Sequence, residues 1–104
     1  MAAFVISEVE ALDAELFEKY RTIAAESIAK YRGRYLVRGA EPEVAEGQPS
    51  SRRVVVVEFE SMEMLKRWYS SAEYAEALKI RMQALDRRLI FVEGVPQVSA
   101  KIDA

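Results

Sequence analysis

The stretch SMEMLKRWYSSAEYAEALKIR, residues 61–81, is decisive for the fold. It predicts two short helices that meet at a pair of serines. Ser61 can cap the first helix, and Ser70 lies three residues before Glu73, which fits a capping box for the second. Directly upstream, VVVVEF at residues 54–59 predicts a β-strand. A strand that leads at once into helices indicates an α+β protein.

Outward from this stretch, β-branched and aromatic residues predict further strands on both sides. The full set of strands is expected at residues 3–10, 34–39, 53–59 and 88–93. A long helix is expected from its N-cap Asp13 to Gly33, which would be the left-handed residue at its end. Residues 41–51 hold two prolines and a glycine and predict a loop. The resulting order, β-α-β-β-α-β, predicts a ferredoxin-like fold with a four-stranded antiparallel sheet and its helices on one face.

Composition limits the chemistry that this chain can perform. Its 104 residues fit one domain, expected at residues 1–96, followed by a C-terminal tail at residues 97–104. The sequence has no Cys and no His, which excludes thiolate sites and imidazole bases, and we expect neither a metal nor a cofactor. The net charge of -2, with interspersed signs, argues against nucleic acid as a partner. Without a long apolar stretch or a basic N-terminus, we expect a cytoplasmic protein with no membrane partner.

Strands that are apolar on both faces predict a homodimer. In the third strand, Val55, Val57 and Phe59 share one face, while Val54 and Val56 lie on the other. The helices of this topology can cover only one face, so a second copy of the sheet would cover the other. A standard interface of this kind removes about 800 Å² of surface per partner. The alternative is a monomer with an exposed apolar face.

Several motifs resemble a known family. GRYLVRG at residues 33–39, VVVVEF leading into Ser61, and WYSSAEY at residues 68–74 resemble domain of unknown function 1330, over residues 3–95. That family is similar in fold to the dimeric α/β barrels, which include cofactor-free antibiotic-biosynthesis monooxygenases, muconolactone isomerases, stress-response barrels and haem-degrading or haem-peroxidising proteins. The resemblance implies two sheets packed face to face in a dimer. It implies no particular activity, because the family has none generally assigned.

Arg38 is the first candidate for ligand binding. Arg34, Leu36 and Arg38 are expected on one face of the second strand, because side chains alternate along a strand. The planar guanidinium of Arg38 could bind a carboxylate or another small oxyanion. Alternatively, Arg38 pairs with Glu58 or Glu8 on a neighbouring strand, or points to solvent.

Aromatic residues of the helices are further candidates. Trp68 and Tyr69 are adjacent, so their side chains diverge by about 100° on a helix. We expect one of them in the core and the other, with Tyr20 and Tyr74, in a cleft between the helices and the sheet. Arg81 could reach the same cleft. The alternative for the aromatic residues is packing in the core. The alternative for Arg81 is that the aliphatic part of its side chain packs on apolar neighbours while its guanidinium stays in water.

Glu58 is the only carboxylate expected inside a strand with apolar residues before and after it in sequence. Burial disfavours the charged form of a carboxyl, which makes Glu58 the best candidate general base in a chain without His. The alternative is an ion pair with Arg34, Arg38 or Arg53. The sequence therefore suggests a homodimer whose cleft takes a small organic metabolite, acidic in view of the arginines. Such a protein is either a cofactor-independent enzyme or a non-catalytic module that binds a ligand or only dimerises.

Overall fold

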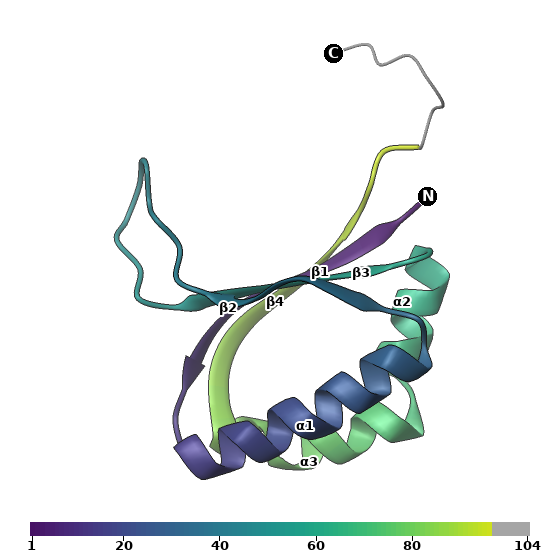
Figure 1. The fold of residues 1–104 in the computed structure, drawn as a ribbon, viewed down its shortest axis with the longest axis horizontal. Coiled ribbons are helices and arrows are strands. Elements are labelled where there is room, and N and C mark those ends of the chain that lie inside the picture. Colours follow the sequence, from purple (N-terminus) through teal and green to yellow (C-terminus); the bar gives the residue numbers. More distant parts are fainter. Residues whose placement is uncertain (97–104) are drawn as a thin grey trace.

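One four-stranded antiparallel sheet carries three helices on a single face in the computed structural model (Figure 1), which describes residues 1–96. The elements are β1 (Ala3–Ala11), α1 (Ala14–Lys30), β2 (Arg34–Ala40), β3 (Arg53–Phe59), α2 (Met62–Tyr69), α3 (Ala72–Ala84) and β4 (Leu85–Glu93). The strand order is β2-β3-β1-β4, with β1 and β3 in the centre. This arrangement confirms the ferredoxin-like fold. The predicted tail, residues 97–104, lies outside the described residues.

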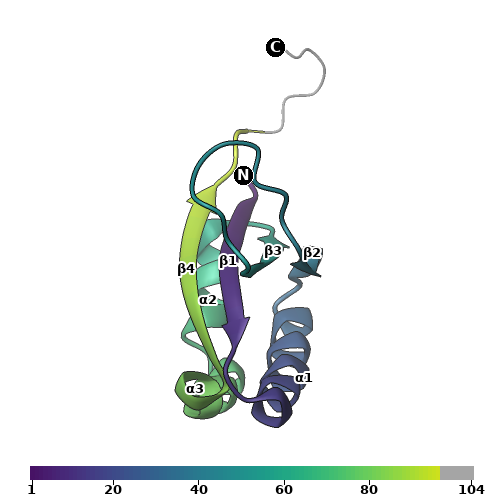
Figure 2. The ribbon, with the colours of Figure 1, turned by 90° about the vertical axis from the view of Figure 1, so that its left-hand side faces the viewer.

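The central strands alternate between two environments, which the sequence predicted for β3. On β1, Ala3, Val5, Ser7 and Val9 are buried beneath the helices, and the residues between them are half-buried on the other face. Val5 lies opposite Val57 of β3, so the two strands present their inner side chains to the same helices. A turned view shows α1 and α3 side by side, with α2 above α3 and behind β4 (Figure 2).

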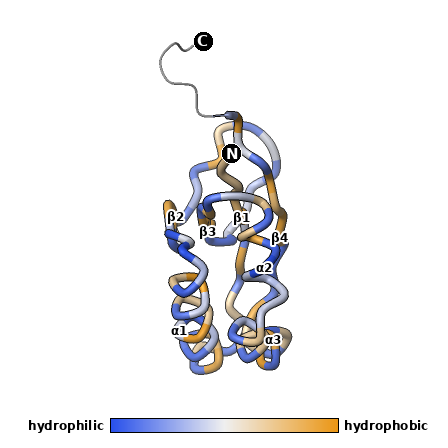
Figure 3. The backbone as a smooth tube through the Cα atoms, turned by 90° about the vertical axis from the view of Figure 1, so that its right-hand side faces the viewer, coloured by the Kyte–Doolittle hydropathy of each residue, from blue (hydrophilic) through white to orange (hydrophobic). Residues whose placement is uncertain are grey.

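The open face of the sheet, which the helices do not cover, is apolar along its centre. The side chains of this apolar strip are Phe4, Ile6, Val54, Val56, Ile90 and Val92. Hydropathy colouring shows that β1, β3 and β4 are largely hydrophobic (Figure 3). The loop between β2 and β3 rises on this same side of the sheet (Figure 1).

Two helix starts follow the predicted capping pattern. Leu16 donates its backbone N–H to the carboxylate of Asp13 at 3.0 Å, and Met64 donates its N–H to Ser61 Oγ at 3.1 Å. Each side chain satisfies one of the backbone donors that a helix leaves unpaired in its first turn.

The start of α3 was predicted one residue too early. Ser71 caps this helix, because Tyr74 donates its backbone N–H to Ser71 Oγ at 3.0 Å. Ser70 instead donates its hydroxyl to the Lys66 carbonyl at 2.8 Å and closes the last turn of α2. Two adjacent serines could each serve as the cap, and in the structure Ser71 caps α3 while Ser70 ends α2.

Gly33 was predicted to be the left-handed residue after α1, and this prediction was wrong. Arg32 has the positive φ, 64°, and Gly33 donates its N–H to the Ile28 carbonyl at 2.9 Å. A Cβ on Gly33 would lie 2.8 Å from side-chain atoms of both Ile28 and Phe59. Close packing therefore requires glycine at position 33.

The second strand is irregular, and the expectation that Arg34, Leu36 and Arg38 share one face was wrong. Arg34 lies opposite Glu58, whereas Arg38 lies opposite Val55, after a shift in register between β2 and β3. Because Glu58 and Val55 point to opposite faces of β3, Arg34 points to the open face and Arg38 to the helix side.

The last strand begins at Leu85, earlier than predicted, because α3 passes into β4 without a loop. The Ala84 carbonyl at this junction accepts the Leu12 backbone N–H at 2.9 Å. The longer strand places Arg87 opposite Val9 of β1, on the helix side of the sheet.

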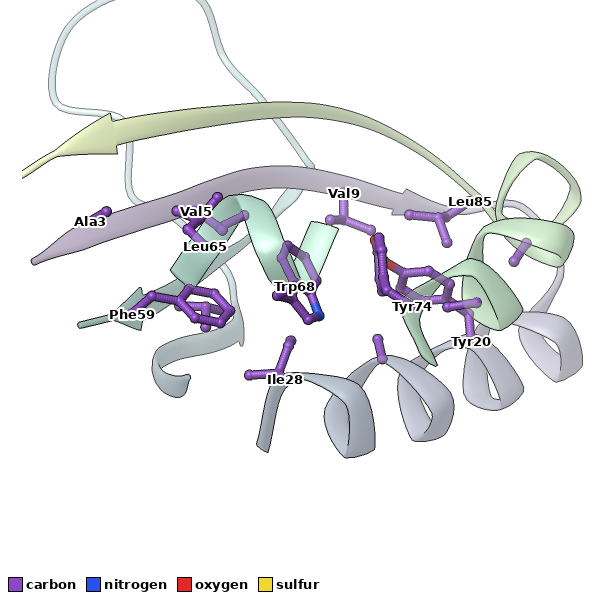
Figure 4. Close-up of a cluster of buried hydrophobic side chains, with 14 residues drawn as sticks. Ala3, Val5, Val9, Tyr20, Ile28, Phe59, Leu65, Trp68, Tyr74 and Leu85 are labelled. Carbon is purple, nitrogen blue, oxygen red and sulfur yellow. The ribbon is translucent and has the colours of Figure 1, made fainter. Parts of the chain in front are cut away.

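The core between the sheet and the helices is built around aromatic rings (Figure 4). Trp68 is 2% exposed, and its ring centre lies 4.2 Å from that of Tyr74 and 5.4 Å from that of Phe59. Its indole N–H donates to Ser27 Oγ at 2.9 Å, so this buried polar atom is satisfied.

Candidate functional site

A cavity of about 450 Å³ lies between α1 and the helix side of the sheet. Its walls are largely apolar, and among the side chains that form them are Val5, Phe17, Ala24, Val57, Trp68 and Leu89. The sheet supplies the floor because every second residue of each strand points to this side. Volumes of this order are typical of sites for small organic molecules.

Among residues 1–96, four arginines also line the cavity, together with a single carboxylate, that of Glu10. Arg21 forms an ion pair with Glu18 at 3.0 Å on the surface of α1. Within residues 1–96, the other three, Arg38, Arg53 and Arg87, have no carboxylate at ion-pair distance. The cavity therefore carries an excess of positive charge.

Arg87 is the most enclosed of these unpaired cations, and it is bonded to the first of two linked tyrosines. Its Nη1 donates to the Tyr20 hydroxyl at 2.6 Å, and that hydroxyl lies 2.5 Å from the Tyr74 hydroxyl. Burial raises the pKa of the Tyr20 phenol well above its ordinary value, and the nearby Tyr74 adds to this effect while Arg87 opposes it. The Tyr20 phenol is thus neutral at physiological pH and provides no counter-charge for the half-buried guanidinium.

Arg38 and Arg53 are exposed at the rim of the cavity. The guanidinium carbon of Arg38 lies 4.4 Å from the ring centre of Tyr35, a cation–π contact. Arg53 donates to the Gly39 carbonyl at 3.2 Å. Both side chains are placed where they can attract and contact an entering anion.

Ser7 lies in the floor of the cavity, at the centre of the sheet. Its neighbours across the strands are Val55 on β3 and Leu89 on β4. The residue is 5% exposed, and its Oγ has no hydrogen-bond partner within the part of the chain that the structure describes. Buried hydroxyls are normally paired, so this one calls for an explanation.

The structure brings together some of the residues singled out in the sequence. Arg38, Tyr20 and Trp68 line the cavity, and Tyr74 is joined to it through the Tyr20 hydroxyl. Trp68 belongs at the same time to the core, so core packing and the cleft are not exclusive for this residue. Their roles toward a ligand stay predictions.

Three other candidates do not line the cavity. Tyr69 is 37% exposed and packs edge-on against Phe91, with ring centres 5.3 Å apart. Arg81 is on α3 and has no part in the cavity wall. Glu58 is on the open face, paired with Arg34 at 2.6 Å, which confirms the ion pair given as the alternative to a general base.

The two polar residues that the sequence reasoning missed, Ser7 and Arg87, were missed for different reasons. Arg87 was excluded because β4 was started too late. Ser7 did carry a signal, because it is a polar residue between Val5 and Val9 on the inner face of a strand.

No cluster of three or more His, Cys, Asp or Glu side chains within residues 1–96 could hold a metal ion. Among the helices that the structure describes, none is both long and apolar enough to cross a membrane.

The family described as Domain of unknown function (DUF1330) matches residues 2–95. The chain belongs to this family. No curated protein sequence matches this DUF1330 chain.

Solved structures resemble the DUF1330 chain over nearly its whole length. RPA0582 from Rhodopseudomonas palustris, a protein of unknown function, superposes with a TM-score of 0.75 at 18% identity, covering 92% of this chain and 84% of its own. SnoaB, a cofactor-independent oxygenase from Streptomyces nogalater, gives 0.61 at 9% identity, covering 95% and 98%. A dimeric ferredoxin-like protein of unknown function from Thermobifida fusca gives 0.60 at 13% identity, covering 89% and 91%. At these identities the likeness extends to the fold alone.

Proposed function

We propose that this protein is a homodimer that binds a small organic acid in the cavity of each copy. The observation that carries the proposal is Arg87, a half-buried guanidinium in a largely apolar cavity with no carboxylate partner within residues 1–96. An anion bound there would supply the missing counter-charge, and a guanidinium binds a carboxylate through two parallel hydrogen bonds.

The apolar walls favour a ligand with a hydrocarbon or aromatic body. Side chains such as Val57 and Leu89 would contact that body, while the exposed guanidinium groups of Arg38 and Arg53 draw the acid toward the opening. A small inorganic anion would leave most of these apolar surfaces without contact.

The homodimer is supported by the open face of the sheet. Its apolar strip is continuous across three strands, and monomers seldom expose a patch of this kind. The similar protein from Thermobifida fusca is described as dimeric. The cavity is on the helix side, so pairing of two open faces leaves both cavities accessible. A cytoplasmic location stays a prediction.

Catalysis is the second candidate, favoured by the Tyr20 hydroxyl. This neutral phenol lines the cavity beside Arg87 and could stabilise negative charge that develops on a substrate oxygen. A cofactor-independent oxygenase is among the proteins of similar fold. The general-base role of Glu58 also stays a prediction, although its carboxylate lies on the face away from the cavity.

Calorimetric titration with benzoate and its neutral isostere benzamide tests the binding proposal. Benzoate should bind at least tenfold more tightly than benzamide, and Arg87→Met should remove most of that preference. Arg88→Met is the matched control, because Arg88 is the next residue of β4 and points to the open face. Equal binding of both compounds, or equal effects of both substitutions, would overturn the proposal.

A further inference from the structure

We infer that the natural ligand is a hydroxy or oxo acid, with a second oxygen that hydrogen-bonds to Ser7 in the cavity floor. This inference rests on the proposed function and narrows the ligand class. A plain hydrocarbon acid would satisfy the cavity arginines and the apolar walls but would leave the Ser7 hydroxyl without a partner.

The first observation is the state of Ser7 itself. It is 5% exposed, it lines the cavity, and its Oγ has no hydrogen-bond partner among residues 1–96. An apolar residue at this position would avoid the cost of a buried, unpaired hydroxyl, and Val5 and Val9 show that the inner face of β1 accepts valine. Rotation about one side-chain bond is enough to direct the hydroxyl to a ligand.

The second observation is the position of Ser7 among the cavity arginines. Arg87 is two residues from Leu89, which lies directly opposite Ser7, so Arg87 is a diagonal neighbour at roughly 7–8 Å between Cα atoms. Arg38 lies opposite Val55, the other direct neighbour of Ser7, and is two strands away at roughly 10 Å.

This spacing sets the geometry of the ligand. An acid group held by Arg87 or Arg38 leaves the body of a ring-sized molecule lying over Ser7, within reach of its hydroxyl. Ser7 can donate to a carbonyl oxygen and can both donate to and accept from a hydroxyl. Aromatic hydroxy acids and compact oxo acids share these features, and they are the class that the site fits.

Titration of the protein with benzoate and with 2-, 3- and 4-hydroxybenzoate separates this inference from the proposed function. At least one of the hydroxy isomers should bind about fivefold to tenfold more tightly than benzoate, as expected for one added hydrogen bond. Ser7→Ala should abolish that gain and leave the affinity for benzoate within about twofold of the parent.

A matched control is Ser27→Ala, because Ser27 is also a buried serine but is fully paired. It donates to the Ala24 carbonyl at 2.8 Å and accepts from the Trp68 indole at 2.9 Å. Ser27→Ala should lower the melting temperature by about 5 °C, whereas Ser7→Ala should leave it unchanged or raise it.

The outcomes are distinct. A gain for a hydroxy isomer that disappears in Ser7→Ala supports the inference. If no isomer exceeds benzoate, or if the gain survives Ser7→Ala, the role of Ser7 is wrong while the organic-acid proposal stands. If benzoate itself does not bind the parent protein, the proposed function fails and the inference fails with it.

Discussion

Arg87 combines partial burial, a fixed positive charge and a neutral hydrogen-bond partner, Tyr20. Its Nη1 donates to Tyr20, whose phenol stays protonated because burial, together with the nearby Tyr74, raises its pKa. The half-buried charge of Arg87 contributes little to the stability of the fold, because removing a guanidinium from water is costly when no anion is bound to it.

The stability of Arg87→Met tests this view of the residue. We expect its free energy of unfolding in urea to stay within about 1 kcal/mol of the parent, or to rise, because the substitution removes an unpaired charge and keeps the apolar stem. Arg88→Met serves as the exposed control. A loss of more than about 2 kcal/mol for Arg87→Met alone would show that the guanidinium is a structural anchor.

Residues 32 and 33 provide a second test at this scale, because Arg32, and not Gly33 as expected, is the left-handed residue after α1. Gly33→Ala should cost about 1–3 kcal/mol, since the new Cβ would lie 2.8 Å from Ile28 and Phe59 side-chain atoms. Arg32→Gly should be neutral or should stabilise by up to about 1 kcal/mol, because Arg32 has a φ of 64°. Chemical denaturation of both variants checks this, and a stable Gly33→Ala would contradict the packing role.

The sequence shows the residue types at positions 7 and 33 but not the side chains that lie next to them in the fold. Glycine after a helix is most often the left-handed residue, so the pattern could not reveal that Phe59, far along the chain, crowds position 33. Ser7 shares a face of its strand with Val5 and Val9 in the sequence pattern. Its missing partner became visible only with the opposite strands in place.

At the scale of elements, the C-terminus of α1 is tied to the first turn of α3. Glu73 pairs with Lys30 at 2.7 Å and accepts a hydrogen bond from the Tyr31 hydroxyl at 3.0 Å. The Lys30 hydrogen bond, followed by a backbone hydrogen bond and Tyr31, lowers the pKa of the Glu73 carboxyl to about 2. Glu73 therefore joins α1 to α3.

The acid stability of Glu73→Gln tests this link. The pKa of Glu73 in the folded state lies below its ordinary value, so the ionised carboxylate stabilises the fold. This contribution to stability is complete above about pH 4.5 and is lost as the pH falls toward about 2. Glu73→Gln should lower the melting temperature by a few degrees at pH 7 and by almost nothing near pH 2. A difference that does not change with pH would show that the charge of Glu73 is irrelevant to stability.

Element types followed from the sequence, whereas boundaries and registers did not. The period-two pattern of β3 assigned both faces of this strand correctly. The register shift in β2 left no trace in the pattern, and it moved Arg38 to the cavity and Arg34 to the open face. Helix α3 passes directly into β4, so the sequence contains no turn residue that would indicate the early start of this strand.

At the scale of the whole molecule, the sheet separates two proposed tasks. The open face would join two copies, and the helix side would bind the ligand. Apolar side chains on both faces already suggested this separation in the sequence. The sequence suggested a cleft between the helices and the sheet, but it could not give the full lining of the cavity, which comes from all four strands, α1 and α2.

Val56→Glu tests the independence of these tasks. Val56 lies opposite Ile6 at the centre of the open face, and a carboxylate there would be buried without a partner in the proposed interface. We expect a monomer by analytical ultracentrifugation that still binds benzoate. Met82→Glu is the control, because Met82 is 76% exposed on α3, and this variant should stay dimeric. A dimeric Val56→Glu protein would contradict the proposed interface.

The central claim is that an organic anion binds on the helix side of the sheet, against Arg87. The most direct measurement is an NMR titration with benzoate that follows backbone amides and arginine side-chain N–H signals. Saturable shifts are predicted for the cavity residues Ser7, Trp68 and Arg87, with no change at Arg34 and Arg88 on the open face. Shifts confined to the open face, or no saturable shift in the cavity, would contradict the account.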